Sequence, residues 1–446
     1  MSLSKLIISF SFVSIWLTEM AQAQILPRGV GAVYVGNRSF GSGTPYFDVN
    51  GKPTTLSERF DMNYSGSFLR SGKAGTDLKS LYDNIRAFEA AKGTYEPTLA
   101  DDLQLGVQKA QVDVNFDAKV LGFGYGLNER WTLLLGIPIM RASIAADIDV
   151  TGSNNALMIK NRLGDAAFDE LKDGLDEASR INRTTILSKI QDEYRYKDIS
   201  YWEYYGFGDI LLGGRTSWNF ANAKRPNYSL MLTTYLSLPT GPKHDPDALA
   251  QVPVSRGFTA LDITSDHKFK WDLMTLGGEI GGALGLPQKT VRRVPVGSEV
   301  LITPDRKVEV NWSPGPETWI SAYAGVGTST YQAQYKLGMN EDHPDTFSGP
   351  IEGDYKIMVQ ENSSQEIYHQ LNFTLSTVEL FNSNKFVMPF ILTLTGHQSI
   401  GGRTTLGKRY IELTFMTFFK TPAARDDASS PGKSLAMNDQ SRRRSQ

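Results

Sequence analysis

Hydrophobic and polar residues alternate one by one along several stretches of the chain. The clearest stretch is 111–120, QVDVNFDAKV, in which every odd position is polar and every even position is apolar. A similar alternation marks 228–238, 370–376 and 411–415. Because successive side chains of a β-strand point to opposite faces of the sheet, each stretch is interpreted as a strand with one polar and one apolar face.

The pattern predicts about twelve strands, joined by connections that alternate between long and short. The strands are expected near 28–38, 107–126, 130–150, 206–219, 227–239, 257–270, 273–286, 303–313, 317–338, 364–380, 385–397 and 408–420. The short connections carry turn residues, at 127–129, 221–226, 271–272, 314–316 and 381–384. The long connections are 39–106, 151–205, 240–256, 287–302, 339–363 and 398–407.

This sorting of loop lengths is typical of bacterial outer-membrane barrels, which have short periplasmic turns and long extracellular loops. A soluble β-sandwich, the alternative, has no reason to sort its loops in this way. We therefore predict an all-β fold, a transmembrane antiparallel up-and-down β-barrel, with ten or fourteen strands as alternatives to twelve. The least regular stretch is 303–338, where a turn near Gly327 and Thr328 would divide a strand that is otherwise too long.

The two ends of the chain are not expected to belong to the barrel. Residues 1–23 form a secretory signal peptide, with Lys5, an apolar run over 6–17 and the small residues Ala21 and Ala23 before the cleavage point. The barrel is expected over 24–420, and the polar tail 421–446 is expected to be disordered in the periplasm. The prediction is thus an exported protein of the cell outer membrane.

Two inserts in the long loops have helical rather than strand periodicity. Residues 76–92 and 164–193 place apolar side chains at helical spacing. Both inserts fall in expected extracellular loops. Two interpretations remain open, a lid or constriction over the pore and a simple packing element at the barrel mouth.

Composition excludes several classes of function. With 46 Lys and Arg against 48 Asp and Glu, the formal charge is −2, which does not fit a nucleic-acid-binding protein. The chain has no cysteine, so disulfides and thiolate metal sites are excluded. The partners expected are outer-membrane lipid and a small-molecule solute, while the oligomeric state is not set by the pattern.

Motifs for catalysis are few. The five histidines form no recognisable zinc motif, and no cofactor or metal site is predicted. His397 and Ser399 have the spacing of the dyad in outer-membrane lipid hydrolases, where the base and nucleophile face the lipid. Here the apolar face of the strand holds Phe390, Leu392 and Leu394, so strand parity directs the pair into the lumen. The chain is therefore not expected to be an enzyme.

The same parity argument predicts which polar side chains line the lumen. The set contains both signs of charge, which does not favour a pore selective for one sign. Its members are Asp113, Asn115, Asp117, Lys119, Asp262, Asp266, Lys268, Asn372 and Glu412. A separate aromatic-rich stretch, 194–207, is interpreted either as part of an outer aromatic girdle or as a vestibule for apolar solutes.

Pro138 interrupts an expected strand, and a proline cannot donate a hydrogen bond to a neighbouring strand. We expect a β-bulge or kink there. Two interpretations remain, a bulge that shapes the barrel and a lateral opening through which an apolar solute leaves the lumen.

Three short segments resemble recurrent pieces of a known group of barrels. YGLNERW at 125–131, GFGDI at 206–210 and LPTG at 238–241 resemble the outer-membrane barrels of the phenol-degradation MetA-pathway group. That group is similar to the FadL-type transporters of fatty acids and hydrocarbons, although their Asn-Pro-Ala signature and N-terminal hatch are not apparent here. The resemblance is best over 105–290, and it implies a channel for passive uptake of small apolar or aromatic molecules.

Two other functions stay open. One is a structural or adhesive barrel that acts through its extracellular loops, and the other is a barrel lipid hydrolase.

Overall fold

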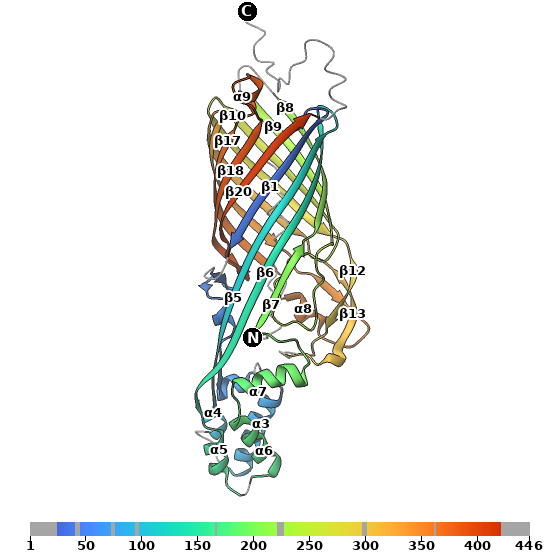
Figure 1. Ribbon diagram of the computed structural model, residues 1–446. Helices are drawn as coiled ribbons and strands as arrows, with labels where there is room; N and C mark the ends of the chain where they lie inside the picture. The colour runs from blue at the N-terminus through green and yellow to red at the C-terminus, as the bar shows by residue number, and fades with distance from the viewer. Residues whose placement is uncertain are drawn as a thin grey trace, which may run out of the picture.

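The computed structural model describes residues 25–40, 45–72, 76–93, 98–165, 167–220, 227–296, 301–360 and 363–420. The expected signal peptide 1–23 and tail 421–446 lie outside these residues. Among the described residues no helix is long and apolar enough to cross a membrane. Twelve strands form a closed antiparallel barrel, in which the first strand pairs with both the second and the last (Figure 1).

The barrel strands follow one another around the wall in sequence order. They are β1 (Val30–Phe40), β5 (Gln104–Gly126), β6 (Trp131–Asn154), β8 (Ile210–Phe220), β9 (Asn227–Leu238), β10 (Ala260–Trp271), β11 (Met274–Gly285), β14 (Glu317–Gly327), β15 (Tyr331–Asp342), β17 (Ser364–Ser376), β18 (Phe390–Arg403) and β20 (Arg409–Lys420). The predicted fold class is confirmed.

An exposed apolar belt covers the outer face of these strands. Ile280, Phe373 and Leu413 are about half exposed, while Asn372, Glu412 and Thr414 on the other face are buried. Since residues directly opposite one another on paired strands share a face, the pairing register assigns every barrel residue to the inside or the outside. The alternation in the sequence thus corresponds to an exposed apolar outer face and a buried inner face of the barrel.

The stretch 303–338 differs from the expectation. The segment expected near 303–313 is β13 (Lys307–Ser313), which forms a small sheet outside the barrel with β12 (Gln288–Arg293) and β16 (Thr346–Ser348). The stretch 317–338 is divided into β14 and β15. Their turn is held by Thr328, whose Oγ1 accepts from the backbone N–H of Tyr331 at 3.1 Å. The segment 303–313 is therefore not a barrel strand, whereas the division of 317–338 adds one. The number of barrel strands stays at twelve.

The connections are sorted between the two ends of the barrel, as the sequence predicts. The short ones lie at the end where β1 begins and β20 ends, and one of them carries α9 (Val378–Asn382). The segment 314–316 is an exception, because it lies at the long-loop end between β13 and β14. The long loops also contain short elements: β2 (Tyr46–Phe47), β3 (Pro53–Thr54), η2 (Ser57–Phe60), η4 (Pro304–Arg306), α8 (Tyr355–Gln360) and β19 (Thr405–Leu406).

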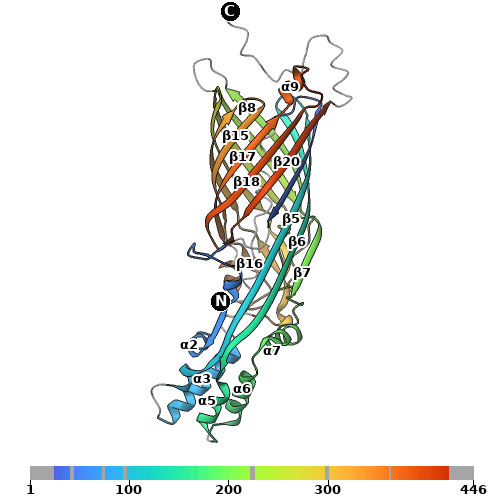
Figure 2. The ribbon, with the colours of Figure 1, turned by 60° about the vertical axis from the view of Figure 1, so that its left-hand side comes forward.

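Strands β5 and β6 are about twice as long as the other barrel strands and extend as a ribbon beyond the long-loop end (Figures 1 and 2). β4 (Met62–Ser65) pairs with β5 and β7 (Tyr201–Phe207) pairs with β6. β7 holds part of the aromatic-rich stretch, and its Tyr205 and Phe207 are exposed on the outer face. Their position favours the girdle interpretation over the vestibule.

A small helical layer packs on the far end of this ribbon. Its elements are α2 (Gly66–Arg70), α3 (Thr76–Ala91), α4 (Leu99–Asp102), α5 (Ala156–Leu163), α6 (Asp169–Ser179), α7 (Arg183–Ser188) and the π-helical turn η3 (Lys189–Glu193). Fully buried Ile85, Ile159 and Leu171 belong to its core. Figures 1 and 2 place the layer well beyond the barrel rim, so its helices neither cover nor pack the mouth.

Candidate functional site: the barrel interior and its outer mouth

Charged side chains on the inner face of the barrel pair with one another across strands. Nε of Arg38 on β1 donates to Oε2 of Glu412 on β20 at 2.8 Å. Lys336 on β15 pairs with Glu279 on β11 in the same way. A buried charge is costly unless it is paired and hydrogen-bonded, and all four side chains are at most 10% exposed. The pairs explain how the lumen holds many ionisable groups.

Five of the nine side chains predicted to line the lumen lie on its inner face by register. They are Asp262, Asp266, Lys268, Asn372 and Glu412. Asp266 accepts from the Tyr323 hydroxyl at 2.6 Å, and Asn372 accepts from Thr395 Oγ1 at 2.9 Å. The inner polar residues therefore form a hydrogen-bonded lining.

The prediction is wrong for the four residues on β5. Ala118 lies directly opposite Arg38 on the paired strand, and Arg38 lies opposite Glu412, so these three side chains share the inner face. The odd-numbered residues of β5 must then point outward. These are Asp113, Asn115, Asp117 and Lys119.

The physical reason for the inversion is the length of β5. The N-terminal part of β5 extends beyond the apolar belt at the long-loop end, so its outward side chains are not in the apolar belt and can be polar. The apolar residues that alternate with them, such as Val114 and Phe116, pack inside and are at most 5% exposed. Alternation alone does not tell which of the two faces is the inner one.

The lumen has one apolar wall. The inner faces of β1, β5 and β6 contribute buried apolar side chains that belong to one cluster, Ala32, Phe116, Ala118, Val120 and Met140. The loop 239–259 between β9 and β10 adds Val252 and Val254 to the same cluster. Apart from Arg38 of β1, the charged side chains of the barrel interior lie on the strands from β8 to β20, so the interior presents a mainly apolar surface opposite a polar one.

Pro138 lies on the inner face where β6 changes its partner. Gly136 pairs with Leu211 of β8, whereas Ile139 pairs with Phe207 of β7. Between these pairs, two residues of β6 oppose three residues of the β7–β8 segment, which makes a β-bulge. The expected irregularity is therefore present, but the extra residue belongs to the neighbouring strand.

The wall is joined on both sides of Pro138. Val120 of β5 is its register partner, and Gly208 N–H donates to the Pro138 carbonyl at 2.9 Å. The lateral opening considered for Pro138 is thus not present between these described strands. The bulge accommodates the missing N–H of the proline without leaving a gap.

The bulge directs Asp209 into the barrel mouth. Asp209 is fully buried, and its carboxylate accepts from the backbone N–H groups of Gly241 at 3.1 Å and Arg256 at 2.8 Å and from Ser255 Oγ at 2.6 Å. All three donors belong to the loop 239–259. One side chain of the wall therefore holds both ends of this loop.

Arg256 fixes the same loop to the polar wall. Its guanidinium donates to Asp262 at 2.9 Å and to Glu317 at 2.7 Å, and its side chain is 3% exposed. Burial alone would lower the pKa of Arg256, but the charges of Glu317 and Asp262 outweigh burial and raise that pKa. The loop 239–259 is therefore fixed to the wall at the long-loop end of the barrel.

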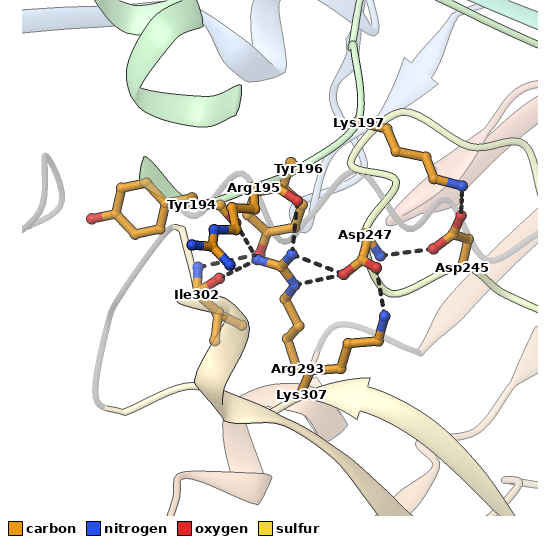
Figure 3. Close-up of polar contacts among 9 residues, drawn as sticks. All are labelled: Tyr194, Arg195, Tyr196, Lys197, Asp245, Asp247, Arg293, Ile302 and Lys307. Carbon is orange, nitrogen blue, oxygen red and sulfur yellow. Dashed lines mark hydrogen bonds and ion pairs between the residues drawn. The ribbon is translucent and has the colours of Figure 1, made fainter. Parts of the chain in front are cut away.

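Outside the mouth, Asp247 joins three long loops (Figure 3). Arg293 on β12 donates to Asp247 Oδ1 at 2.8 Å and to the carbonyl oxygens of Tyr194 and Ile302, each at 2.6 Å. Lys307 on β13 binds the other oxygen of Asp247. These contacts form the Asp247 cluster, which links the β6–β8, β9–β10 and β11–β14 connections.

The Asp247 cluster favours the ionised carboxylate. Burial would raise the pKa of Asp247, but the hydrogen bonds from Lys307 and Arg293 outweigh it and hold that pKa below its usual range. In the same loop, burial lowers the pKa of His244 to about 3, with a smaller effect from Arg292. His244 is therefore neutral at physiological pH.

His397 and Ser399 point into the lumen and share one partner. The Ser399 hydroxyl donates to Glu366, and His397 Nε2 lies 3.3 Å from the same Glu366 oxygen. Lys408 pairs with the other Glu366 oxygen at 2.7 Å. Because both side chains are at most 6% exposed and face away from lipid, this arrangement is a buried polar network.

Sequence reasoning missed Arg38, Asp209 and Arg256. Arg38 lies between the polar residues Asn37 and Ser39 and shares a face with Gly36 and Phe40, so no alternation of polar and apolar residues marks its face. Asp209 and Arg256 lie in connections, where their partners depend on a bulge and on loop folding. Among the described residues no group of three or more His, Asp or Glu side chains has the geometry of a metal site.

No protein-family model matches the sequence, and no curated protein matches it. Among solved structures, the chain is similar to the COG4313 outer membrane channel from Pseudomonas putida F1, with a TM-score of 0.47 and 10% identity over 88% of this chain and 97% of that one. It is also similar to a Pseudomonas aeruginosa FadL homologue, with a TM-score of 0.27 and 9% identity over 88% and 90% of the two chains.

A third similar structure is the CymD monoaromatic hydrocarbon channel, with a TM-score of 0.27 and 5% identity over 89% of this chain and 90% of that one. All three scores are below 0.5. The chain's own strands define the class, a closed twelve-stranded antiparallel β-barrel. The resemblance to the MetA-pathway group stays a prediction.

Proposed function

We propose that this barrel is an outer-membrane channel for passive uptake of small, mainly apolar or aromatic molecules. The membrane location is supported by the apolar belt, in which large side chains such as Ile280 and Leu413 are about half exposed on the outer face. Such exposure is expected of residues that meet lipid. Export through a cleaved signal peptide over 1–23 is part of the proposal.

The observation that carries the channel function is the divided lumen. A barrel that conducts only hydrophilic solutes needs polar side chains on all sides, whereas here the wall of β1, β5 and β6 is apolar apart from Arg38. An apolar or aromatic solute can lose water against this wall while its polar group meets the opposite one. The loop 239–259 at this end of the barrel is anchored by the polar contacts of Asp209 and Arg256 and by Val252 and Val254, which pack on the apolar cluster.

The test is uptake into liposomes that contain the purified protein, with phenol and glycerol as paired apolar and hydrophilic solutes. Val120→Asp places a carboxylate on the apolar wall, and the control Thr264→Asp places one on the polar wall, where Asp262 and Asp266 flank it. Folding of both variants is checked by heat-modifiable electrophoretic mobility.

Phenol uptake is expected to fall in Val120→Asp and to persist in Thr264→Asp. Equal losses in both variants, or no uptake of any solute by the unmodified protein, would contradict the proposal.

The second candidate is a structural or adhesive barrel, favoured by the helical layer that the β5–β6 ribbon holds far from the rim (Figure 2). A variant that lacks 66–102 separates the two functions. Loss of cell-surface contacts with unchanged uptake would support adhesion through the layer, and loss of uptake would assign the layer to the channel.

A further inference from the structure

The outer face of the barrel changes from apolar to polar abruptly where β1 and β5 approach the long-loop end. On β1, the exposed Val35 is followed on the same face by Asn37 and Ser39. On β5, Phe123 and Leu121 are followed by Lys119 and the other outward polar residues. These side chains lie directly beyond the apolar belt, toward the long-loop end of the barrel.

A hollow of about 1310 Å³ is bordered by residues of β1, β5, β6, β15, β17, β18 and β20, and most of these residues, among them Ser39, Arg141 and Ile411, point outward by register. We call it the outer groove. Gly396 lies in its floor, and a Cβ added there would meet no atom within 4 Å. Pockets for drug-sized ligands usually enclose roughly 300–1,000 Å³. The outer groove is thus large enough for a group of about the size of a disaccharide.

The chemistry of the outer groove is amphipathic along the strand direction. Arg141 on β6 and Arg409 on β20 are exposed at its polar edge. Ile411 and Leu371, which are 70% and 42% exposed, lie on the side of the apolar belt. Along each strand, polar groups thus lie toward the long-loop end and apolar groups toward the belt, and across the strands Arg141, Ser39 and Ile411 lie in one row. A membrane glycolipid likewise presents a polar phosphorylated sugar next to apolar acyl chains.

Charge complementarity favours an anionic headgroup. Arg141, Arg409 and the nearby Lys119 point outward, and arginine forks match phosphate oxygens in geometry. Arg141 already pairs with Glu203 at 2.9 Å, but its side chain is 65% exposed and keeps donors free to reach a ligand. Asp117 also lines the outer groove, so the net positive charge is modest.

We propose that the outer groove binds the phosphorylated sugar headgroup of an outer-leaflet glycolipid of the lipid A type. The phosphates lie at Arg141 and Arg409, the sugar hydroxyls at Asn37 and Ser39, and the acyl chains along Ile411 and neighbouring apolar side chains. The proposal rests on the outer-membrane location proposed above, but it does not depend on which solute crosses the lumen.

The test compares bis-phosphorylated lipid A with its dephosphorylated form, each added to purified protein in detergent and followed by native mass spectrometry. The variant is the double substitution Arg141→Gln and Arg409→Gln. The control is Arg130→Gln, an exposed arginine in a turn at the opposite end of the barrel.

Phosphorylated lipid A is expected to be retained by the unmodified protein and by Arg130→Gln, and to be bound at least about tenfold more weakly by the double variant. Phenol uptake is expected to stay unchanged in the double variant, which separates this result from the channel proposal. Heat-modifiable mobility verifies that the double variant is folded.

Three results would overturn the proposal. One is equal retention of both lipid A forms, because the phosphates would then play no part. The second is retention that the double variant does not alter. The third is a lipid-free dimer that the double variant dissociates, since the occupant would then be a second copy of this chain.

Discussion

Arg38 and Glu412 are 374 positions apart in the sequence, yet Nε of Arg38 lies 2.8 Å from Glu412 Oε2 inside the barrel. The pair joins the first strand to the last and is buried, with 2% and 0% of the two side chains exposed. Closure of the barrel therefore includes an ion pair as well as the hydrogen bonds between β1 and β20.

Removal of one partner of this pair should be costly. Arg38→Met leaves the Glu412 carboxylate buried without its main cation, and such changes typically cost about 3–5 kcal/mol. The combined change Arg38→Met and Glu412→Leu should restore much of the loss, because no charge is then left alone. The measurement is urea unfolding of the protein refolded in lipid vesicles. A double variant as unstable as the single one would argue against a closing role for the pair.

The apolar belt predicts a depth-dependent cost of charge on β11. Ile280→Arg, on the outer face near the middle of the strand, should destabilise by about 2–4 kcal/mol, while the same change at Leu286, just beyond the strand end, should cost about 0–1 kcal/mol. Both residues are more than half exposed, so packing losses are matched. The same vesicle unfolding assay applies, and equal costs would contradict the assigned depth.

Acid should loosen the Asp247 cluster. The pKa of Asp247 is lowered in the folded state, so its ionised form stabilises the fold above the ordinary carboxyl pKa of about 4. This stability is lost as the pH falls through the lowered pKa of the folded state. Pepsin cleavage of the long loops should therefore increase as the pH is lowered below about 4.

Asp247→Asn should remove this pH dependence, because the amide carries no titrating charge. Asp173→Asn, an exposed change in the helical layer, serves as the control and should behave like the unmodified protein. Cleavage with the same pH profile in all three proteins would exclude Asp247 as the titrating group.

The mouth loop predicts a gain of conductance. Arg256→Met removes the contacts to Asp262 and Glu317 and should release the loop 239–259 from the polar wall. Single-channel current in planar bilayers is expected to increase, and Arg180→Met in the helical layer is expected to leave it unchanged. A current that does not change in Arg256→Met would show that this loop does not limit conduction.

The strand number and loop sorting could be predicted because period-two alternation and turn residues are local properties of the chain. The position of 303–313 could not, because β12, β13 and β16 are also amphipathic strands and only their partners place them outside the barrel. The inversion on β5 has a similar origin. Whether Asp117 or Ala118 faces inward depends on the register with Arg38, and alternation contains no information on register.

The site was harder to predict than the fold. Its anchors, Asp209 and Arg256, act through backbone N–H groups and through a bulge opposite Pro138, and neither leaves a periodic pattern in the sequence. The strand pattern predicts the inner-face position of side chains such as Asp262 and Asn372. It does not predict the position of side chains that depend on a single loop conformation.

The long ribbon of β5 and β6 connects the helical layer mechanically to the barrel wall. At roughly 3.4 Å per residue, a strand of this length extends about 80 Å, whereas a membrane crossing takes only about 9–11 residues. A force on the helical layer is therefore transmitted along β5 and β6 to the part of the wall where β6 changes its pairing partner from β8 to β7. The bulge opposite Pro138 lies at this change of partner, next to Asp209 and the loop that Asp209 anchors.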